Sequence, residues 1–333
     1  MVRRPDLQHD VAHPPRHLRA AFEQRLHVLV IEPRGKLRNR ISIDVVAPQS
    51  SQVLDHAVGS LRGIAQHWCA AVLQRDASAS GLAPDRWPGA SFCSIAAVGF
   101  SLSAHIIGAE QGWIARDTVR ELTLTTLRFF RDAPQCPAAR GTAGHRGFFY
   151  HFLDMRTGLR APKSELSTVD TALLVGGMLH AQAFFDGDHP DEVAIRDTVD
   201  QIYWRIDWKW AQVRGQLISM GWSPEKAFIP HDWNGYNEAM LVVLLALGSP
   251  THPVEEGAWS AWSESYRGTW GRFMGYEHLS FAPLFGHQYS HLWIDFRGIQ
   301  DAYMRGRGID YFENSRRAVL SQRAYAVANP SRF

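Results

Sequence analysis

The sequence lacks the features that mark membrane proteins, disulfide-rich domains and nucleic-acid-binding proteins. No apolar run approaches the roughly 18 residues that a membrane-spanning helix needs, and the longest run, from Met240 to Leu247, ends at Gly248 and Pro250. The 3 cysteines have no paired spacing, so they encode neither a disulfide framework nor a structural zinc cluster. With Lys+Arg 35 against Asp+Glu 33, the net charge of +2 is too small to attract nucleic acid or anionic lipid.

Motifs for cofactor and phosphate chemistry are also absent. The sequence has no GxGxxG after a strand, no Walker loop and no GxSxG, which argues against dinucleotide, phosphate-loop and serine-hydrolase functions. We therefore expect no cofactor. A secretory signal needs an apolar region of about 7–15 residues near the start, whereas the first apolar segment, residues 26–31, is short and contains His27. The sequence thus assigns no location to the protein.

The remaining composition is that of a folded protein, with 45% apolar and 11% aromatic residues. Residues 1–40 differ from the rest, because they carry nine cations, four anions and four prolines without a sustained helical or strand period. We predict that residues 1–52 form a poorly ordered basic leader and that residues 53–333 form one domain. A nucleic-acid-binding arm is the less favoured alternative, because Phe22 is the only aromatic residue in this opening.

Apolar residues recur at three- and four-residue spacing from about residue 53 onward, which is typical of helices separated by short Gly, Pro and Asp turns. The predicted helices span residues 91–110, 117–131, 164–185, 190–220, 234–247 and 309–328. Only residues 147–154 resemble a strand, and one short strand cannot support a sheet. The sequence therefore predicts an all-α fold of helical hairpins, either an open solenoid or a closed ring, and the position of the aromatic residues favours the ring.

The 12 tryptophans concentrate in connecting segments, beside polar residues. Trp and Tyr present flat apolar faces with a polar edge, which suits stacking on sugar rings while carboxylates and Arg bind hydroxyl groups. For any single Trp, a position that caps the core at a helix end is the simpler explanation, so the hypothesis depends on the cluster. The predicted sugar-binding residues in these segments are Asp85, Arg86, Trp87, Trp233 and Trp293.

Three carboxylates lie next to apolar segments, where Asp and Glu are rare unless they are paired or functional. Glu165 and Asp170 precede an apolar run. A helix there would begin at Ser164 or Thr168, so helix capping is an alternative to catalysis for these two acids. Glu238 begins the most apolar predicted helix, where its alternative role is a favourable charge at a helix N-terminus, worth roughly 0.3–1 kcal/mol.

Two histidines, His287 and His291, lie four residues apart, a spacing that on a helix points both imidazoles the same way, as a zinc pair requires. The segment lacks the Glu of the HExxH pattern and an evident third ligand. We therefore expect no metal site. We interpret His287 as a sugar-binding residue, together with Tyr289, Asp295 and Arg297.

Four long segments carry a resemblance to a known family. They are GLAPDRWPGASFCSIAAVGF (81–100), GFFYHFLDMRTGLRAPKSELSTVDTALL (147–174), GYNEAMLVVLLALGSPTHP (235–253) and PLFGHQYSHLWIDFRGIQDAYMRGRGIDYFENSRRA (283–318). In this order they resemble the bacterial glucoamylase-like family that includes endo-β-1,2-glucanases. The resemblance runs from about residue 80 to the last residue.

The resemblance implies an (α/α)6 toroid, with an active site in the mouth of the ring that acts on a β-glucan. It places the family's general acid on Glu238, within the YNEAM block that also holds Tyr236, a further predicted sugar-binding residue. Asp170 and Glu165 match the family's functional acidic block, and either of them is the predicted base. Members of the family are often periplasmic or secreted.

The chemistry expected from the residues agrees with this resemblance. Glycoside hydrolysis needs one carboxylic acid with a raised pKa to protonate the leaving oxygen, and a second carboxylate to activate water or attack the sugar. Family members continue past the position of residue 333, so the resemblance also implies a ring that is incomplete at its C-terminal end. The leading hypothesis is a glycoside hydrolase of β-1,2-glucan or a related β-glucan, with an oligo- or polysaccharide as substrate. The alternatives are a catalytically silent fragment that binds carbohydrate and a β-glucan transglycosylase.

Overall fold

A computed structural model of the protein describes residues 81–86, 89 and 91–330, and the backbone of three short strands before them. These strands are β1 (Leu29–Ile31), β2 (Leu37–Asn39) and β3 (Asp44–Val45). β1 pairs with β2, and β3 pairs with β15 (Ile299–Gln300), both in antiparallel register. The rest of the predicted leader, and Trp87, lie outside the described residues, so the domain boundary near residue 53 stays a prediction.

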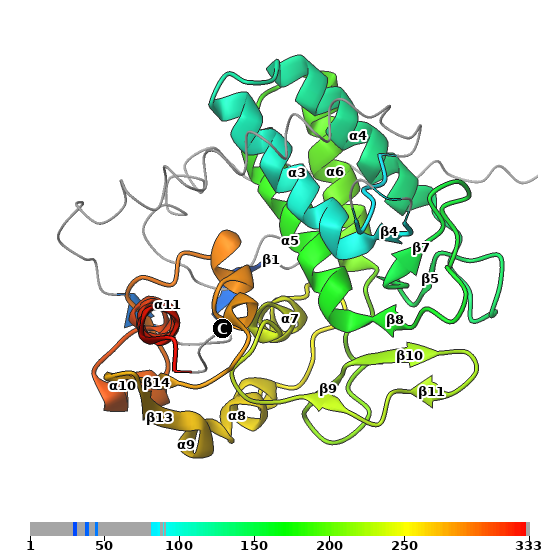
Figure 1. Ribbon diagram of the computed structural model, residues 1–333. Coiled ribbons are helices and arrows are strands. Elements are labelled where there is room, and N and C mark those ends of the chain that lie inside the picture. The colour runs from blue at the N-terminus through cyan, green and yellow to red at the C-terminus, as the bar shows by residue number, and fades with distance from the viewer. Residues whose placement is uncertain are drawn as a thin grey trace, which may run out of the picture.

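Four long helices lie side by side and form one half of the molecule (Figure 1). They are α3 (Ile95–Glu110), α4 (Arg116–Asp132), α5 (Thr168–Phe184) and α6 (Pro190–Trp204). α5 packs against α3 and α6, and α4 packs against the same two helices, so two helical hairpins cover each other. The helices predicted over residues 91–110, 117–131 and 164–185 are confirmed, with shifts of a few residues at their ends.

The helix predicted over residues 190–220 is wrong beyond Trp204, where α6 ends. Its start is correct, because Pro190 occupies the first turn, where a missing N–H costs no helical hydrogen bond. Beyond the helix, Ile206 and Trp208 are fully buried in a turn. Buried apolar residues therefore continue at helical spacing after the helix has ended. For this reason the sequence pattern placed the end of α6 too late.

Close contact between α3 and α5 depends on two glycines. A Cβ atom added to Gly177 of α5 would lie 2.1 Å from the carbonyl oxygen of Gly99, and one added to Gly99 would lie 2.3 Å from the carbonyl oxygen of Leu173. No side chain fits at these distances, so the two helices contact each other through their backbones. This contact fixes α5, whose first turn carries Asp170.

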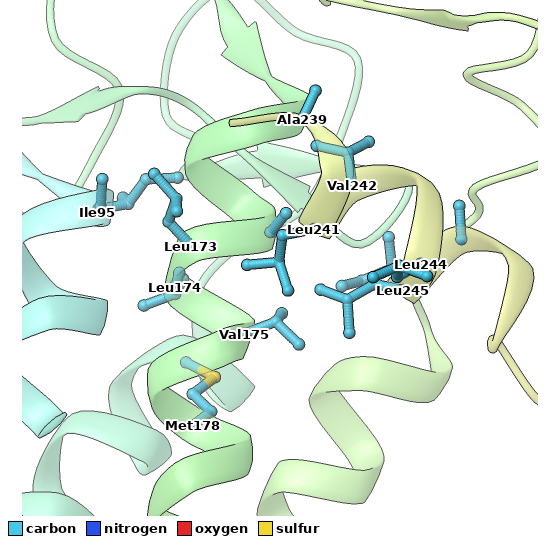
Figure 2. Packing of buried hydrophobic residues seen from close by; sticks show 14 of the residues in the cluster. Ile95, Leu173, Leu174, Val175, Met178, Ala239, Leu241, Val242, Leu244 and Leu245 are labelled. Carbon is cyan, nitrogen blue, oxygen red and sulfur yellow. The ribbon is translucent and has the colours of Figure 1, made fainter. Parts of the chain in front are cut away.

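The most apolar helix, α7 (Met240–Leu247), has all eight residues buried and packs against α5 and α8 (Ala258–Ser263). Figure 2 shows Val175 of α5 on the side that faces Leu241 of α7, and Leu173 on the side toward Ile95 of α3. An apolar surface all round a helix requires burial on every side. The helix predicted over residues 234–247 is therefore correct in its core and wrong at its start, because residues 234–239 form turns.

The C-terminal part of the chain packs on the other side of α7 (Figure 1). It contains α9 (Tyr266–Thr269), the antiparallel hairpin β13 (Trp270–Phe273) and β14 (Tyr276–Leu279), the 3₁₀ turns η2 (Leu284–His287) and η3 (Tyr289–Leu292), α10 (Ala302–Arg307) and α11 (Tyr311–Ala328). Asp301 and Asp310 cap α10 and α11 by accepting backbone hydrogen bonds of 2.8 and 2.6 Å. The helix predicted over residues 309–328 is confirmed as α11.

Short antiparallel strand pairs join the helices, so an all-α description is too simple. The strands in this part are β4 (Cys93–Ser94), β5 (Gly144–His145), β6 (Phe148–Phe149), β7 (Phe152–Leu153), β8 (Leu166–Ser167), β9 (Ile218–Ser219), β10 (Gly221–Ser223), β11 (Ala227–Phe228) and β12 (Asp232–Trp233). They pair as β4–β7, β5–β6, β9–β12 and β8–β10–β11. The predicted strand over residues 147–154 supplies β6 and β7. β6 pairs with the adjacent β5, and β7 pairs with the distant β4, each a segment of two residues that is too short to show an alternating pattern.

Candidate active site

The first carboxylate, Asp170, lies in the first turn of α5, directly after strand β8. Ser167 caps the helix, because its Oγ accepts the backbone N–H of Asp170 and donates to the Asp170 carboxylate. The cap is thus Ser167, and not Ser164 or Thr168 as the sequence suggested. Asp170 completes the cap, but its side chain is only 13% exposed, and burial raises its pKa above the ordinary value.

Glu165 lies one residue before β8 and is joined to His151, which lies between β6 and β7. The His151 Nδ1 is 2.8 Å from Glu165 Oε1, and its Nε2 is 3.7 Å from Asp170 Oδ1. Burial lowers the pKa of His151, but the hydrogen bond to Glu165 and the charge of Asp170 raise it more, so the net direction is upward. For Glu165 the signs are reversed. Burial raises its pKa, but the hydrogen bond with His151 lowers it, and the net direction is below the ordinary value. One imidazole therefore connects both predicted base candidates.

The third carboxylate, Glu238, lies in the turn that precedes α7. Its Oε2 is buried without a hydrogen-bond partner among the described residues. Burial raises the pKa of Glu238, and the charge of Asp170 raises it further. Ser290 of η3 holds the backbone of this turn, because its Oγ donates a 3.3 Å hydrogen bond to the carbonyl oxygen of Glu238.

Asp170 and Glu238 thus interact electrostatically, although one lies in α5 and the other in the turn before α7. The charge of Asp170 disfavours the ionised form of Glu238, so the two acids do not both ionise easily. A protonated acid beside an ionised carboxylate is the arrangement that general acid and base catalysis requires.

An aromatic cluster lies beside these carboxylates. Burial raises the pKa of Tyr289, and the charges of Glu238 and Asp170 add to that rise, which places the phenol near both acids. The ring of Tyr289 lies 4.9 Å from that of Phe100 in α3, and Phe100 stacks on Trp293 at 5.5 Å. Tyr289 and Trp293 are half-buried, so each keeps part of its ring accessible.

Trp293 is also held firmly by the helices behind it. Its Nε1 donates a 2.9 Å hydrogen bond to Ser103 Oγ of α3. Its ring lies against Gly176 of α5, where an added Cβ atom would come within 2.8 Å of the indole. Trp233, in β12, donates from Nε1 to Thr168 Oγ1 at the start of α5, over 2.9 Å. The two predicted tryptophans in the described residues are thus fixed against the helix that carries Asp170.

Two predicted sugar-binding residues lie in the core instead. Tyr236 is 3% exposed, and its hydroxyl hydrogen-bonds with Ser315 Oγ of α11 at 2.7 Å. His287 is 1% exposed, its Nε2 lies 3.2 Å from the carbonyl oxygen of Phe281, and burial lowers its pKa to about 4. The structure thus places both side chains in the core, and their assignment to sugar binding stays a prediction. The sequence did not reveal this burial, because the Tyr236 hydroxyl finds its partner in a distant segment.

The remaining predicted sugar-binding residues are exposed ion pairs. Arg297 binds both carboxylate oxygens of Asp295, at 2.7 and 3.0 Å from its Nε. Arg86 contacts Asp85 at 3.2 Å, and its side chain is 83% exposed. The negative charge of Asp85 contributes to the raised pKa of His151, which places Asp85 on the His151 side of the site.

No metal-ligating geometry appears in the described part of the chain. His287 ends η2 and His291 lies in η3, so they do not share one helical turn, and His291 Nε2 is 2.9 Å from Ser315 Oγ. Within the described ranges, no group of three or more His, Cys, Asp or Glu side chains is arranged to hold a metal ion. Likewise, none of the helices in these ranges is long and apolar enough to span a membrane.

A separate cavity of about 360 Å³ lies between the β13–β14 hairpin and α11. The three arginines that line it are paired with carboxylates: Arg272 with Glu277 at 3.0 Å, and Arg316 and Arg317 with Glu313 at 2.6 and 2.8 Å. Because these charges are already matched, the cavity offers no unpaired cation to an anionic ligand. It contains none of the three candidate catalytic carboxylates.

His151 and Ser290 contact the candidate carboxylates, and sequence reasoning missed both. His151 is a polar residue within the apolar run 147–154, and that interruption was the available signal. Nothing in the sequence indicates that Ser290 contacts the backbone of Glu238, because the contact joins segments far apart in the chain.

Comparisons with known proteins show what the chain is similar to. The Glycoamylase family model, described as "putative glucoamylase", matches residues 230–333. The exo beta-1,2-glucooligosaccharide sophorohydrolase (non-reducing end) of Parabacteroides distasonis is 28% identical over 283 residues. That match covers 75% of this chain and 37% of the relative, so the chain spans little more than a third of that protein's length.

Solved structures share the fold. A Bacteroides uniformis protein described in the same words as the family model is 26% identical, with a TM-score of 0.72 over 85% of this chain and 68% of that one. The endo-beta-1,2-glucanase of Chitinophaga pinensis, solved with sophorotriose and glucose, is 24% identical, with a TM-score of 0.71 over 83% of this chain and 68% of that one. Together the matches confirm the resemblance of the chain to the glucoamylase-like family that includes β-1,2-glucanases.

Proposed function

We propose that the chain is a glycoside hydrolase that cleaves a β-glucan, with β-1,2-glucan as the favoured substrate. The observation that carries this proposal is the pair Asp170 and Glu238, whose pKa values are both raised by burial beside the aromatic cluster of Phe100, Tyr289 and Trp293. The relatives whose names specify β-1,2-linked substrates support the choice of linkage.

In this proposal Glu238 is the general acid. Its raised pKa favours the protonated carboxyl more than in an ordinary Glu, and a protonated carboxyl can donate a proton to the glycosidic oxygen as the bond breaks. The unpartnered Oε2 is consistent with that role, because no neighbouring donor stabilises the ionised form there. Asp170 is the base or nucleophile, because its charge acts directly on Glu238. Glu165 remains the second candidate for that role.

We also propose that the helices form the (α/α)6 ring of the glucoamylase-like fold. The pairs α3–α4 and α5–α6 are successive helical hairpins, and α7 packs against both α5 and α8. Tyr289, Trp233 and Trp293 would line the sugar-binding face, with Asp295, Arg297, Asp85 and Arg86 at its exposed edge. We include Trp87 among the sugar-binding residues from the sequence alone, because it lies outside the described residues.

The test is hydrolysis by the full chain of linear and cyclic β-1,2-glucans, with β-1,3- and β-1,4-glucans for comparison. We expect reducing sugar from the β-1,2 substrates, and loss of at least about 10²-fold in kcat for Glu238→Gln. Glu256→Gln is the matched control, because Glu256 is exposed and the substitution removes the same charge. Equal rates for Glu238→Gln and the wild type would contradict the assignment of the acid.

Two other outcomes would favour the alternatives. Sugar binding without product would support a catalytically silent carbohydrate-binding chain. Products longer than the substrate would support a transglycosylase, in which a sugar hydroxyl replaces water as the acceptor.

A further inference from the structure

His151 occupies a position between two carboxylates that no assigned role explains. Its Nδ1 lies 2.8 Å from Glu165 and its Nε2 lies 3.7 Å from Asp170. A neutral imidazole carries one N–H and no charge, whereas a protonated imidazole donates to Glu165 and holds its positive charge within ion-pair distance of Asp170. The geometry therefore favours a ring that carries a positive charge.

The backbone and a neighbouring ring fix the orientation of the imidazole. His151 stacks on Phe152 with 3.8 Å between ring centroids and an interplanar angle of 17°. Its backbone N–H donates to the carbonyl oxygen of Glu165 over 2.9 Å, and its own carbonyl accepts the N–H of Ile95 over 3.2 Å. Both ring nitrogens are thus held toward the carboxylates by elements on either side.

The charges that act on His151 are negative, and they stabilise a protonated imidazole. Asp85 approaches from the segment before β4, Glu165 from the segment before β8, and Asp170 from α5. Arg160, whose charge acts on Glu165, is paired with Glu225 at 2.7 Å and donates to the carbonyl oxygen of Ser164. The charge of Asp170 in turn acts on Glu238.

We propose that His151 is a positioning residue that carries a proton between Glu165 and Asp170 and so keeps Asp170 ionised beside a protonated Glu238. This inference rests on the proposed function for its catalytic meaning. Burial alone pushes Asp170 and Glu238 in the same direction and does not decide which one keeps the proton. The contact with His151 makes the two acids different, because Asp170 has a cation beside it while Glu238 Oε2 has no hydrogen-bond partner among the described residues.

The same geometry separates the roles of the two predicted base candidates. Glu165 binds the imidazole directly and holds the proton on it, so it acts through His151. Asp170 is the carboxylate whose charge acts on Glu238. Asp170 is therefore the base or nucleophile, and Glu165 supports the residue that keeps it ionised.

The first experiment needs no substrate. An NMR pH titration would follow the His151 ring nitrogens and the carboxyl carbon of Asp170 in the full chain, with His151 assigned by the loss of its signals in His151→Gln. We expect His151 to titrate above the ordinary value of a histidine, and Glu165→Gln to lower its midpoint by about one pH unit. We expect His151→Gln to raise the Asp170 midpoint by a similar amount.

The matched control is His145→Gln. His145 lies in the neighbouring β5–β6 hairpin, is half-buried, and contacts the Trp210 ring at 5.4 Å. This variant should leave both midpoints unchanged. A His151 midpoint at or below the ordinary value, or an Asp170 midpoint that does not respond to His151→Gln, would overturn the proposal. If His151→Gln fails to fold, the response of His151 to Glu165→Gln decides.

The second experiment is the pH profile of kcat/KM on β-1,2-glucan. His151→Gln should move the acidic limb to higher pH by about one unit, because the base then needs a higher pH to ionise. A lower kcat with an unmoved acidic limb would mean that His151 is only structural, and would overturn the proposal. If the wild type cleaves no glucan, the proposed function fails, and the NMR titration still decides whether His151 keeps Asp170 ionised.

Discussion

Ser290 Oγ donates a hydrogen bond of 3.3 Å to the backbone carbonyl of Glu238, which ties η3 to the turn that carries the proposed acid. Ser290 is itself 2% exposed, so the bond is shielded from water. The adjacent residue, Tyr289, lies beside both carboxylates. One short 3₁₀ turn thus supplies both an aromatic contact and the support for the acid.

Loss of this hydrogen bond should reduce turnover without abolishing it. Ser290→Ala should lower kcat by about three- to tenfold, because a net hydrogen bond of about 1 kcal/mol no longer holds the Glu238 backbone in place. Steady-state kinetics on β-1,2-glucan would measure the change. Ser263→Ala is the control, because Ser263 bonds only within α8. An unchanged kcat in Ser290→Ala would contradict the positioning role.

Substitution at the helix contact should destabilise the fold. Gly177→Ala places a Cβ atom 2.1 Å from the carbonyl oxygen of Gly99, so α3 and α5 must separate, at a cost of about 1–3 kcal/mol. Urea unfolding would measure the loss. Gly306→Ala, in α10, is the control: a Cβ atom there meets nothing within 4 Å, and the variant should gain about 0.5–1 kcal/mol. Equal stability of both variants would show that the backbone contact is not required.

The burial of Glu238 should appear in the pH dependence of stability. Its folded pKa is raised above the ordinary value, so the ionised carboxylate destabilises the fold at any pH above both values, and this cost vanishes below the ordinary value. Glu238→Gln should therefore melt at a higher temperature than the wild type at about pH 8, with a smaller difference at about pH 4. Thermal melts across this range test the prediction without substrate. A difference that stays constant with pH would contradict it.

The exposed pair Asp295 and Arg297 should affect binding more than stability. A surface ion pair contributes about 0–1 kcal/mol to folding, whereas a hydrogen bond from a charged group to a sugar hydroxyl contributes about 1.5–3 kcal/mol. Arg297→Ala should therefore raise KM about tenfold, with the melting temperature nearly unchanged. Arg272→Ala is the matched control, because Arg272 forms an exposed pair with Glu277. A KM effect of the same size in both variants would argue against sugar binding by Arg297.

The sequence predicted the parts of the fold that local patterns determine. The long helices α3, α4, α5 and α11 have apolar faces of many residues, and local side chains cap α3, α5 and α11, so local patterns locate them. The two-residue strands are too short for such a pattern, and β4 and β8 form by pairing with segments distant in sequence. The same limit explains the misplaced end of α6 and the misplaced start of α7.

The candidate site was partly predictable for a similar reason. Glu165, Asp170 and Glu238 stand out because a carboxylate beside an apolar run is unusual in any sequence. Tyr236 and His287 stand out equally, yet they are buried, with the Tyr236 hydroxyl bonded to Ser315 and His287 Nε2 to the backbone of Phe281. His151 could not be recognised from the sequence, because its proposed role depends on two carboxylates that the fold brings to either side of its ring. Whether such a residue is buried or lies in the site depends on contacts that form only in the folded chain, and a single sequence does not reveal those contacts.

The contact between Gly99 and Gly177 leaves no side-chain layer between α3 and α5 that could absorb a shift of one helix against the other. Asp170, anchored at the start of α5, must then move with both helices or not at all. Glu238 lies in turns of residues 234–239, outside any regular element, where backbone torsions can change without sliding a packed helix. If the proposed acid and base adjust their spacing to a substrate, we therefore expect the Glu238 side to move while Asp170 stays in place.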